Sequence, residues 1–327
     1  MPQIVVENLN KTFKIAEREA GILGSLKGLI APRYKTVEAV RNISFSLDAG
    51  ELVGYIGPNG AGKSTTIKTL AGILVPDSGR VEVLGRTPWK ERIAHVQQIG
   101  VVFGQRTQLW WDLPVIESFD LLRDIYRVAP ESYRVKIDEL IALLNLSSLL
   151  DTPVRQLSLG QRMRCDLAAS LLHTPPILFL DEPTIGLDAV SKLAVRDFVR
   201  KLNRDEGVTV ILTTHDMDDI EALCNRVVLI GQGSILLDGT LESLRKQVTG
   251  ERWLIVDLQE ENQTIQVDGA ETLRQDGRRV TLHFDPSKIS TAKLIGEVSE
   301  KYEISDLFVQ NPPIEEIIAR FYGNEGN

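Results

Sequence analysis

A glycine-rich loop that runs into a lysine and a serine contains the residue types needed to hold a phosphate group. The segment 57–66 reads GPNGAGKSTT. Glycines let successive backbone N–H groups point at one anion, the lysine supplies positive charge, and the serine hydroxyl can ligate Mg²⁺. The residues expected to bind a nucleotide here are Gly57, Pro58, Asn59, Gly60, Ala61, Gly62, Lys63, Ser64 and Thr65.

The segments on either side of this loop predict a strand and a helix that position it. Residues 51–56 read ELVGYI, an apolar run typical of a short buried strand, and IKTLAGIL (67–74) has helical periodicity. A strand, a glycine loop and a helix in this order place the positive end of the helix dipole at the phosphates.

Two further apolar segments end in residues suited to the chemistry of a bound nucleotide. PILFLDE (176–182) and VTVILTT (208–214) each predict a strand covered on both faces. Because the carboxyl ends of parallel strands meet at one edge of a sheet, we expect Asp181, Glu182 and His215 to lie near the loop. There Asp181 would hold Mg²⁺ through water, and Glu182 would polarise the attacking water as general base. A histidine such as His215 at a strand end is usually a structural hydrogen bonder, but beside a γ-phosphate it becomes a candidate sensor.

Composition limits the kinds of partner. The chain has 327 residues and a formal net charge of −8, which argues against nucleic acid as its main partner. Its two cysteines, Cys165 and Cys224, lack the spacing of metal ligands, and this fits a reducing cytosol. The sequence shows no secretory signal and no apolar run of about 18 residues, so we expect any membrane role to depend on a partner.

Six motifs within residues 4–239 resemble, in order and spacing, those of the nucleotide-binding subunit of ATP-binding cassette (ABC) transporters. GPNGAGKS resembles Walker A, ILFLDE resembles Walker B, and LSLGQ (157–161) is similar to the family signature LSGGQ. Gln105 resembles the Q-loop glutamine, the segment 186–188 resembles the D-loop, and His215 resembles the switch histidine.

This resemblance implies the roles of individual residues at a site for ATP and Mg²⁺. The residues implied to be catalytic are Glu182, His215 and Lys63, and the implied metal ligands are Ser64, Gln105 and Asp181. Gln105 and Phe13 are also implied to bind the nucleotide, Phe13 by stacking on adenine. In the family two subunits pack head to tail, so that the signature of one closes over the nucleotide of the other. The residues implied to act on the partner's nucleotide are Ser158, Leu159, Gly160, Gln161 and Asp188.

Three positions depart from the family pattern. Leu159 stands where the signature usually has glycine, and Phe13 stands where a tyrosine usually stacks on adenine. Phe13 is either that stacking platform or a core residue. Around Gln105 the spacing indicates one inserted residue, so Gln108 is a second candidate for the Q-loop role.

The implied fold is an α/β P-loop NTPase of ABC type. It has a RecA-like parallel sheet, an N-terminal antiparallel β-subdomain and a helical subdomain, followed by a small C-terminal α+β domain. We expect the ATPase domain to span 1–244, with the helical subdomain at about 106–165 and an insertion at about 16–36. The accessory domain, a dimer brace or a regulatory module, would span 245–327.

Two segments are candidates for contact with a membrane or its proteins. Residues 20–34, AGILGSLKGLIAPRY, place apolar side chains on one helical face within a basic region. They predict either a helix at the membrane surface or a mobile loop. Trp110 and Trp111 are either docking aromatics for membrane subunits or part of the core of the helical subdomain.

The last part of the chain predicts a small mixed domain. RWLIVDL (252–258), VTLHFD (280–285) and ISDLFVQ (304–310) are typical of strands, and the segments 286–302 and 312–323 are typical of helices. The end of the chain resembles the C-terminal extension of ABC exporters of the drug and antibiotic type.

The resemblance implies an ATPase, converting ATP and water to ADP and phosphate, that drives an exporter of the ABC-2/drug type. Its expected partners are a second copy or a close paralogue, and integral-membrane permease subunits that hold it at the cytoplasmic face of the inner membrane. The extended Q-loop FGQRTQLWWDLP (103–114) is similar to that of the viologen-exporter-like subgroup. Two alternatives stay open: a non-transport cassette ATPase of the iron–sulfur assembly type, and a cassette that binds ATP but hydrolyses it weakly.

Overall fold

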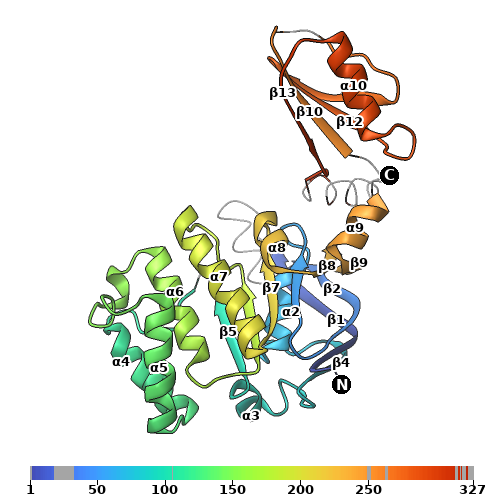
Figure 1. Cartoon of the computed structure of the whole chain (residues 1–327). Coiled ribbons are helices and arrows are strands. Elements are labelled where there is room, and N and C mark those ends of the chain that lie inside the picture. Colours follow the sequence, from blue (N-terminus) through green and yellow to red (C-terminus); the bar gives the residue numbers. More distant parts are fainter. Residues whose placement is uncertain are drawn as a thin grey trace, which may run out of the picture. The chain divides into compact units, whose positions relative to one another are not determined.

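The chain divides into two compact units, Met1–Gly239 and Thr240–Asn327. A computed structural model describes residues 2–17, 33–104, 106–248, 252–261 and 264–313, with Glu316, Ile318 and Tyr322. Figure 1 shows the elements of each unit. No helix among these residues is long and apolar enough to cross a membrane.

A three-stranded antiparallel sheet opens the first unit. Its order is β2-β1-β4, with β1 at Ile4–Glu17, β2 at Arg33–Leu47 and β4 at Ser78–Val83. The pairing of β1 with β2 continues to Glu17 opposite Arg33. The two ends of the insertion expected at about 16–36 therefore lie in this strand pair. Of the segment 20–34, expected to form a membrane-surface helix or a mobile loop, residues 20–32 lie outside the described residues, whereas Arg33 and Tyr34 belong to β2.

A six-stranded sheet forms the centre of the first unit, in the order β5-β6-β7-β3-β8-β9. Its strands are β3 (Leu52–Ile56), β5 (Ile99–Phe103), β6 (Ile177–Asp181), β7 (Thr209–Thr214), β8 (Arg226–Gly231) and β9 (Ser234–Thr240). The five strands from β5 to β8 in this order pair in parallel. Every residue of β3 and β7 is buried, as expected of parallel strands covered on both faces.

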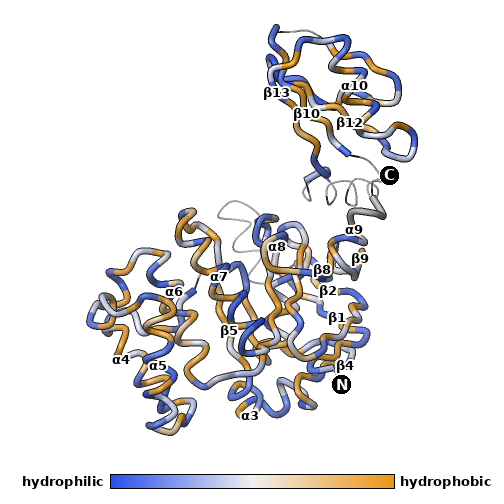
Figure 2. The backbone as a smooth tube through the Cα atoms, viewed as in Figure 1, coloured by the Kyte–Doolittle hydropathy of each residue, from blue (hydrophilic) through white to orange (hydrophobic). Residues whose placement is uncertain are grey.

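Helices cover the sheet and join it to the antiparallel strands. They are α2 (Lys63–Leu70), α3 (Arg92–Val96), α7 (Ala189–Glu206) and α8 (Met217–Leu223). Helix α2 contacts both β2 and β6, so it lies between the two sheets. One hydrophobic core contains side chains from both sheets and α2. Figure 2 shows hydrophobic colouring along the central strands and alternating colouring along α7, which has one solvent-facing side.

A helical layer lies beyond β5. It contains α4 (Val115–Tyr126), α5 (Pro130–Leu144), the short 3₁₀ helix η1 (Val154–Gln156) and α6 (Leu159–Leu171), which packs on β5, α4 and α5. Figure 1 shows this layer in green. The parallel core, the antiparallel subdomain and the helical subdomain are thus the three parts expected from the sequence.

The second unit begins with α9 (Leu241–Val248) and contains a four-stranded antiparallel sheet covered by one helix. The remaining elements are β10 (Arg252–Leu258), β11 (Ala270–Asp276), β12 (Arg279–Phe284), α10 (Thr291–Lys301) and β13 (Ile304–Gln310). Strand β11 was not predicted, because nearly all of its side chains are exposed and it lacks apolar alternation. The second expected helix (312–323) falls mostly outside the described residues.

Candidate nucleotide site

The expected phosphate-binding loop, 57–62, connects β3 to α2, and its geometry requires glycine. Gly62 precedes α2 with a φ of 105°, and a Cβ there would lie 2.3 Å from the Ala39 carbonyl oxygen. A Cβ at Gly57 would lie 2.5 Å from the Ile230 carbonyl oxygen. A side chain at either position would displace backbone. No described side chain caps the N-terminus of α2, so none competes with an anion for its N–H groups.

Lys63 begins α2 and holds its ammonium group over this loop. The side chain is almost fully buried, and Nζ donates to the carbonyl oxygens of Gly57 (2.7 Å) and Pro58 (3.1 Å). Burial lowers the pKa of Lys63, while the carboxylates of Glu182 and Asp181 oppose that change. The positive charge therefore faces both the loop and the acids at the end of β6.

Asp181 joins three elements at the carboxyl edge of the sheet. It ends β6, and its Oδ1 accepts hydrogen bonds from Ser64 Oγ on α2 (3.2 Å) and Thr213 Oγ1 on β7 (2.5 Å). A carboxylate beside a hydroxyl is an all-oxygen donor set, which fits Mg²⁺. Two side chains alone do not complete a metal coordination shell. The described residues also contain no cluster of three or more acidic, histidine or cysteine ligands, so phosphate and water oxygens would supply the rest.

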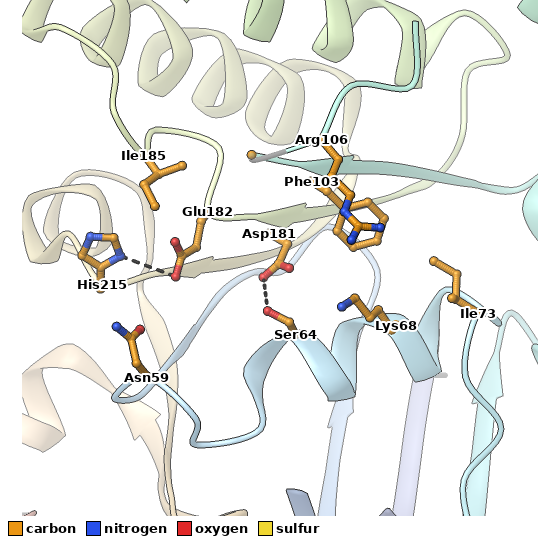
Figure 3. Close-up of a pocket in the computed structure, with 11 residues that line it drawn as sticks. Asn59, Ser64, Lys68, Ile73, Phe103, Arg106, Asp181, Glu182, Ile185 and His215 are labelled. Carbon is orange, nitrogen blue, oxygen red and sulfur yellow. Dashed lines mark hydrogen bonds and ion pairs between the residues drawn. The ribbon is translucent and has the colours of Figure 1, made fainter. Parts of the chain in front are cut away.

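Glu182 follows Asp181 and faces His215 across the site. Its Oε1 lies 3.5 Å from His215 Nδ1, and the imidazole is 57% exposed. Glu182 has a φ of 55°, a conformation that non-glycine residues seldom adopt. Its backbone N–H is held there by the carbonyl oxygen (2.9 Å) and the hydroxyl (3.2 Å) of Thr213. The strained backbone turns the carboxylate out of the strand and toward the histidine (Figure 3).

These residues surround a cavity of about 650 Å³ (Figure 3). Five of the predicted site residues line it: Asn59, Ser64, Asp181, Glu182 and His215. The lining also includes residues that the sequence did not single out: Lys68, Ile73, Phe103, Gly104, Arg106 and Ile185. Phe103 and Arg106 lie within two residues of the expected Q-loop glutamine, Gln105. Their position in that motif could therefore have indicated them as cavity residues. Lys68 lies within α2 and had no such signal.

Gln105 lies outside the described residues, although both of its neighbours line the cavity. The alternative, Gln108, is not among the lining residues. Its side-chain Nε2 donates to the Asp166 carbonyl oxygen (2.9 Å), which ties it to α6. Trp110 and Trp111 are both exposed, and the Arg162 guanidinium lies 5.7 Å from the Trp111 ring. Neither tryptophan belongs to the buried core of the helical subdomain.

Phe13 lies in β1, opposite Val37 of β2, and is half-buried. Phe13 is not among the residues that line the cavity. The Lys11 Nζ lies 5.6 Å from the centre of its ring. The stacking role of Phe13 therefore stays a prediction.

The signature residues lie at the start of α6 and do not line the cavity. Ser158 and Gln161 cap this helix reciprocally: Gln161 N donates to Ser158 Oγ (3.2 Å), and Ser158 N donates to Gln161 Oε1 (2.8 Å). Leu159 packs on the expected D-loop, since a Cβ at Gly186 would lie 2.9 Å from its Cδ2. At Gly160 a Cβ would lie 2.5 Å from Ser191 Oγ.

Asp188 of the expected D-loop caps α7. Its carboxylate accepts from the Ser191 backbone N–H (2.9 Å) and hydroxyl (2.7 Å), and these bonds lower its pKa. Like the signature, it is absent from the cavity lining.

Comparison with known proteins agrees with this arrangement. Residues 40–185 match the family model described as ABC transporter. The daunorubicin resistance ATP-binding protein DrrA3 of Streptomyces coeruleorubidus is 31% identical over 300 residues, which cover 90% of this chain and 94% of that protein. The linearmycin resistance ATP-binding protein LnrL of Bacillus subtilis is 35% identical, over 68% of this chain and 71% of that protein.

Solved structures show the same fold. The ATP-binding cassette MJ0796, a dimer in a post-hydrolysis state with bound ADP and Pi, is 26% identical with a TM-score of 0.61. The match covers 73% of this chain and 98% of that one. The fold class predicted from the sequence is therefore confirmed.

Proposed function

Because the chain belongs to the ATP-binding proteins of ABC transporters, we propose that it is an ATPase that drives an exporter. The observation that carries this proposal is the pairing of Glu182 with His215 at a cavity that also contains Ser64 and Asp181. A general base and a metal-binding pair at one phosphate loop are parts that nucleotide hydrolysis uses, and the histidine can orient the base.

Nucleotide binding is assigned to the loop 57–62 and the start of α2. Their backbone N–H groups and the Lys63 ammonium would hold the phosphates. Ser64 and Asp181 would hold Mg²⁺ together with phosphate oxygens, and Gln105 is proposed to approach it from the loop after β5. The ion supplies charge neutralisation at the phosphates.

Hydrolysis is assigned to Glu182, with His215 beside it. The carboxylate would accept a proton from the water that attacks the γ-phosphate, and His215 would orient that carboxylate and contact the γ-phosphate. The exposed imidazole can reach both, because it lies at the rim of the cavity. The backbone strain at Glu182 would keep the carboxylate aimed at the phosphate site.

The signature residues would act on a second subunit's nucleotide. Ser158, Gly160 and Asp188 do not line the cavity of their own chain, which supports a head-to-tail dimer of two copies or of close paralogues. The related cassette MJ0796 is also dimeric.

We also propose that ATP hydrolysis drives export through separate membrane subunits. The DrrA3 match covers 90% of the chain and so extends into the second unit, which begins at Thr240, whereas the LnrL match covers 68%. Similarity to a relative named for drug resistance therefore reaches into the second unit as well as the cassette, which supports the exporter proposal. Permease subunits would hold the protein at the cytoplasmic face of the membrane and choose the substrate. The viologen-type substrate class rests on the extended Q-loop alone.

Replacement of the proposed base tests the ATPase assignment. We expect Glu182→Gln to lower kcat of the purified chain at least 100-fold, the scale of general-base catalysis, with ATP affinity within about twofold of wild type. Glu131→Gln, on the exposed side of α5, is the matched control and should keep full activity. Wild-type hydrolysis by the Glu182 variant would refute the assignment of the base.

Recovery of partners tests the transport assignment. The tagged chain is purified from gently solubilised membranes, and its partners are identified by mass spectrometry. We expect multi-spanning proteins. Recovery of soluble iron–sulfur assembly proteins alone would favour the non-transport alternative.

A further inference from the structure

The loop between β5 and α4 connects the nucleotide cavity to the helix that carries the signature. Arg106 lines the cavity, and the next two residues, Thr107 and Gln108, both bond to Asp166 of α6. Asp166 lies eight residues after Ser158 (166 − 158 = 8), about 12 Å along the helix at 1.5 Å per residue. One short contact therefore joins the two segments that the proposed function assigns to different nucleotides.

Three hydrogen bonds form this contact. Asp166 Oδ1 accepts from Thr107 Oγ1 (2.8 Å) and from the Gln108 backbone N–H (3.0 Å). In return, Gln108 Nε2 donates to the Asp166 carbonyl oxygen (2.9 Å). The Thr107 hydroxyl also accepts from the Leu109 N–H (3.1 Å), which shapes the loop itself. Two consecutive loop residues are thus fixed to one turn of α6.

Burying the Asp166 carboxylate at this position costs free energy. Asp166 is 3% exposed, and within the described chain it forms no ion pair, although Arg162 one turn earlier attracts it. Burial raises its pKa to about 6. A buried acid held by neutral donors is less favourable for stability than an apolar side chain of similar size. Fold stability alone therefore does not account for an acid at this position.

We propose that Asp166 is a positioning residue that clamps the loop after β5 to α6, so that the cavity of one subunit and the signature it offers to the other move as one body. This inference rests on the proposed function, because it takes α6 to close over the partner's nucleotide. Its consequence is that ATP bound in one site changes how well the opposite site closes, which couples the two sites.

Substitutions at both ends of the clamp test the proposal in the purified full-length chain. Asp166→Leu removes both bonds to Oδ1, Thr107→Val removes one donor at equal volume, and Asp166→Asn keeps the accepting oxygen. We expect the leucine variant to lose a coupling between the two ATP sites of roughly 5- to 150-fold in affinity, so that its Hill coefficient for ATP falls toward one, and we expect its kcat to fall with it. The valine variant should show a smaller loss in the same direction, and the asparagine variant should stay close to wild type.

Binding and control measurements separate positioning from simple damage. The affinity of a single site for ATP, measured in a Glu182→Gln background at a protein concentration too low for dimers, should change by no more than about twofold, because Thr107, Gln108 and Asp166 are not among the residues that line the cavity. Thr36→Val, on an exposed part of β2, is the matched control and should leave the Hill coefficient unchanged.

The outcomes distinguish this inference from the proposed function. If the wild-type chain hydrolyses ATP through Glu182 while Asp166→Leu keeps the wild-type kcat and Hill coefficient, the clamp is wrong and the ATPase assignment stands. If the wild-type chain does not hydrolyse ATP, the proposed function is wrong. If the leucine variant does not fold, the Thr107→Val variant tests the proposal instead. A wild-type Hill coefficient in the Thr107→Val variant would then contradict the proposed clamp.

Discussion

The cavity residues and the signature residues use their polar atoms in different ways. Around the cavity, Ser64 from α2 and Thr213 from β7 both bond to Asp181 at the end of β6, so three elements meet in one cluster. At the start of α6, Ser158 and Gln161 bond to each other and complete a helix cap. The first group is assembled by the fold into a site. The second group forms the capped end of a helix, and it would contact a nucleotide only when a second subunit binds there.

Mixing two inactive variants gives the largest expected effect and tests this difference directly. Lys63→Ala should disable the cavity, and Ser158→Arg should disable the signature without lowering ATP binding, with each variant alone losing about 10³-fold in kcat. An equal mixture should recover up to about a quarter of wild-type activity, because half of the dimers then contain one intact site, and less to the extent that the two sites are coupled. Hydrolysis rates of the mixture measure this recovery. No recovery in a mixture shown to contain mixed dimers would contradict the head-to-tail arrangement.

Stability against pH sharpens the role of Asp166, the acid that joins the two groups. Its folded pKa of about 6 lies above the ordinary value of 3.8, so between these values the folded state binds more protons than the unfolded state. Stability therefore falls as pH rises through this window, by up to about 3 kcal/mol for the 2.2-unit difference (6 − 3.8).

Urea unfolding of Asp166→Asn at pH 4 and pH 8 checks this sign. The asparagine variant should be more stable than wild type at pH 8, and its advantage should shrink at pH 4. The charged groups near Asp166 are Arg162 on α6, which attracts the carboxylate, and Arg106 on the loop, which lines the same small pocket. Asp151→Asn, an exposed control, should show no such trend. An advantage that grows toward acid would contradict the assignment.

Weakening the metal-binding pair should affect the cavity group alone. Asp181→Asn is expected to raise the Mg²⁺ concentration required for hydrolysis by roughly 10- to 100-fold, because it removes charge from the site. Titration of Mg²⁺ at saturating ATP measures this change. The same substitution should leave Ser158 able to serve a partner's site, which the mixing assay also reports. An unchanged Mg²⁺ requirement would remove Asp181 from the metal site.

The smallest expected effect concerns Leu159. Its side chain packs on Gly186, so Leu159→Gly should lower the free energy of unfolding by about 1 kcal/mol or more through lost packing and helix propensity. Hydrolysis should stay within about threefold of wild type, because the Ser158 cap and the Gly160 backbone are kept. Thermal melting and kcat, measured together, separate the two effects. A loss of activity far beyond this would show that the leucine itself acts on the nucleotide.

The sequence predicts those parts of the site that depend on neighbouring residues. The phosphate loop is a short, strand-flanked glycine pattern, and Asp181 and Glu182 follow an apolar run, so both could be predicted, and the structure places Ser64, Asp181 and Glu182 at one cavity. The bond between Thr213 and Asp181 spans 32 positions, and the bond between Thr107 and Asp166 spans 59. These contacts depend on strand order and on how α6 packs against β5, which local periodicity does not encode.

The same limit explains the errors in the fold. The region at about 16–36 was expected to be an insertion, and no strand was predicted at its two ends. The antiparallel pairing of β1 with β2 nevertheless extends to Glu17 and Arg33, because cross-strand partners stabilise strands that the local sequence does not specify. Strand β11 was missed for a similar reason: it pairs with β12 although it buries little apolar surface.

Thr213 makes the two acids at the end of β6 energetically dependent on each other. Its hydroxyl donates to the Asp181 carboxylate and accepts from the Glu182 N–H, so one oxygen supports both residues. Substitutions at Asp181 and Thr213 should therefore be non-additive in a double-mutant cycle, with a coupling of about 0.5–3 kcal/mol typical of residues in one network. A change in the position of the metal ligand Asp181 would reach the general base Glu182 through this single hydroxyl. Loss of the Thr213 hydroxyl should therefore impair both metal binding and hydrolysis.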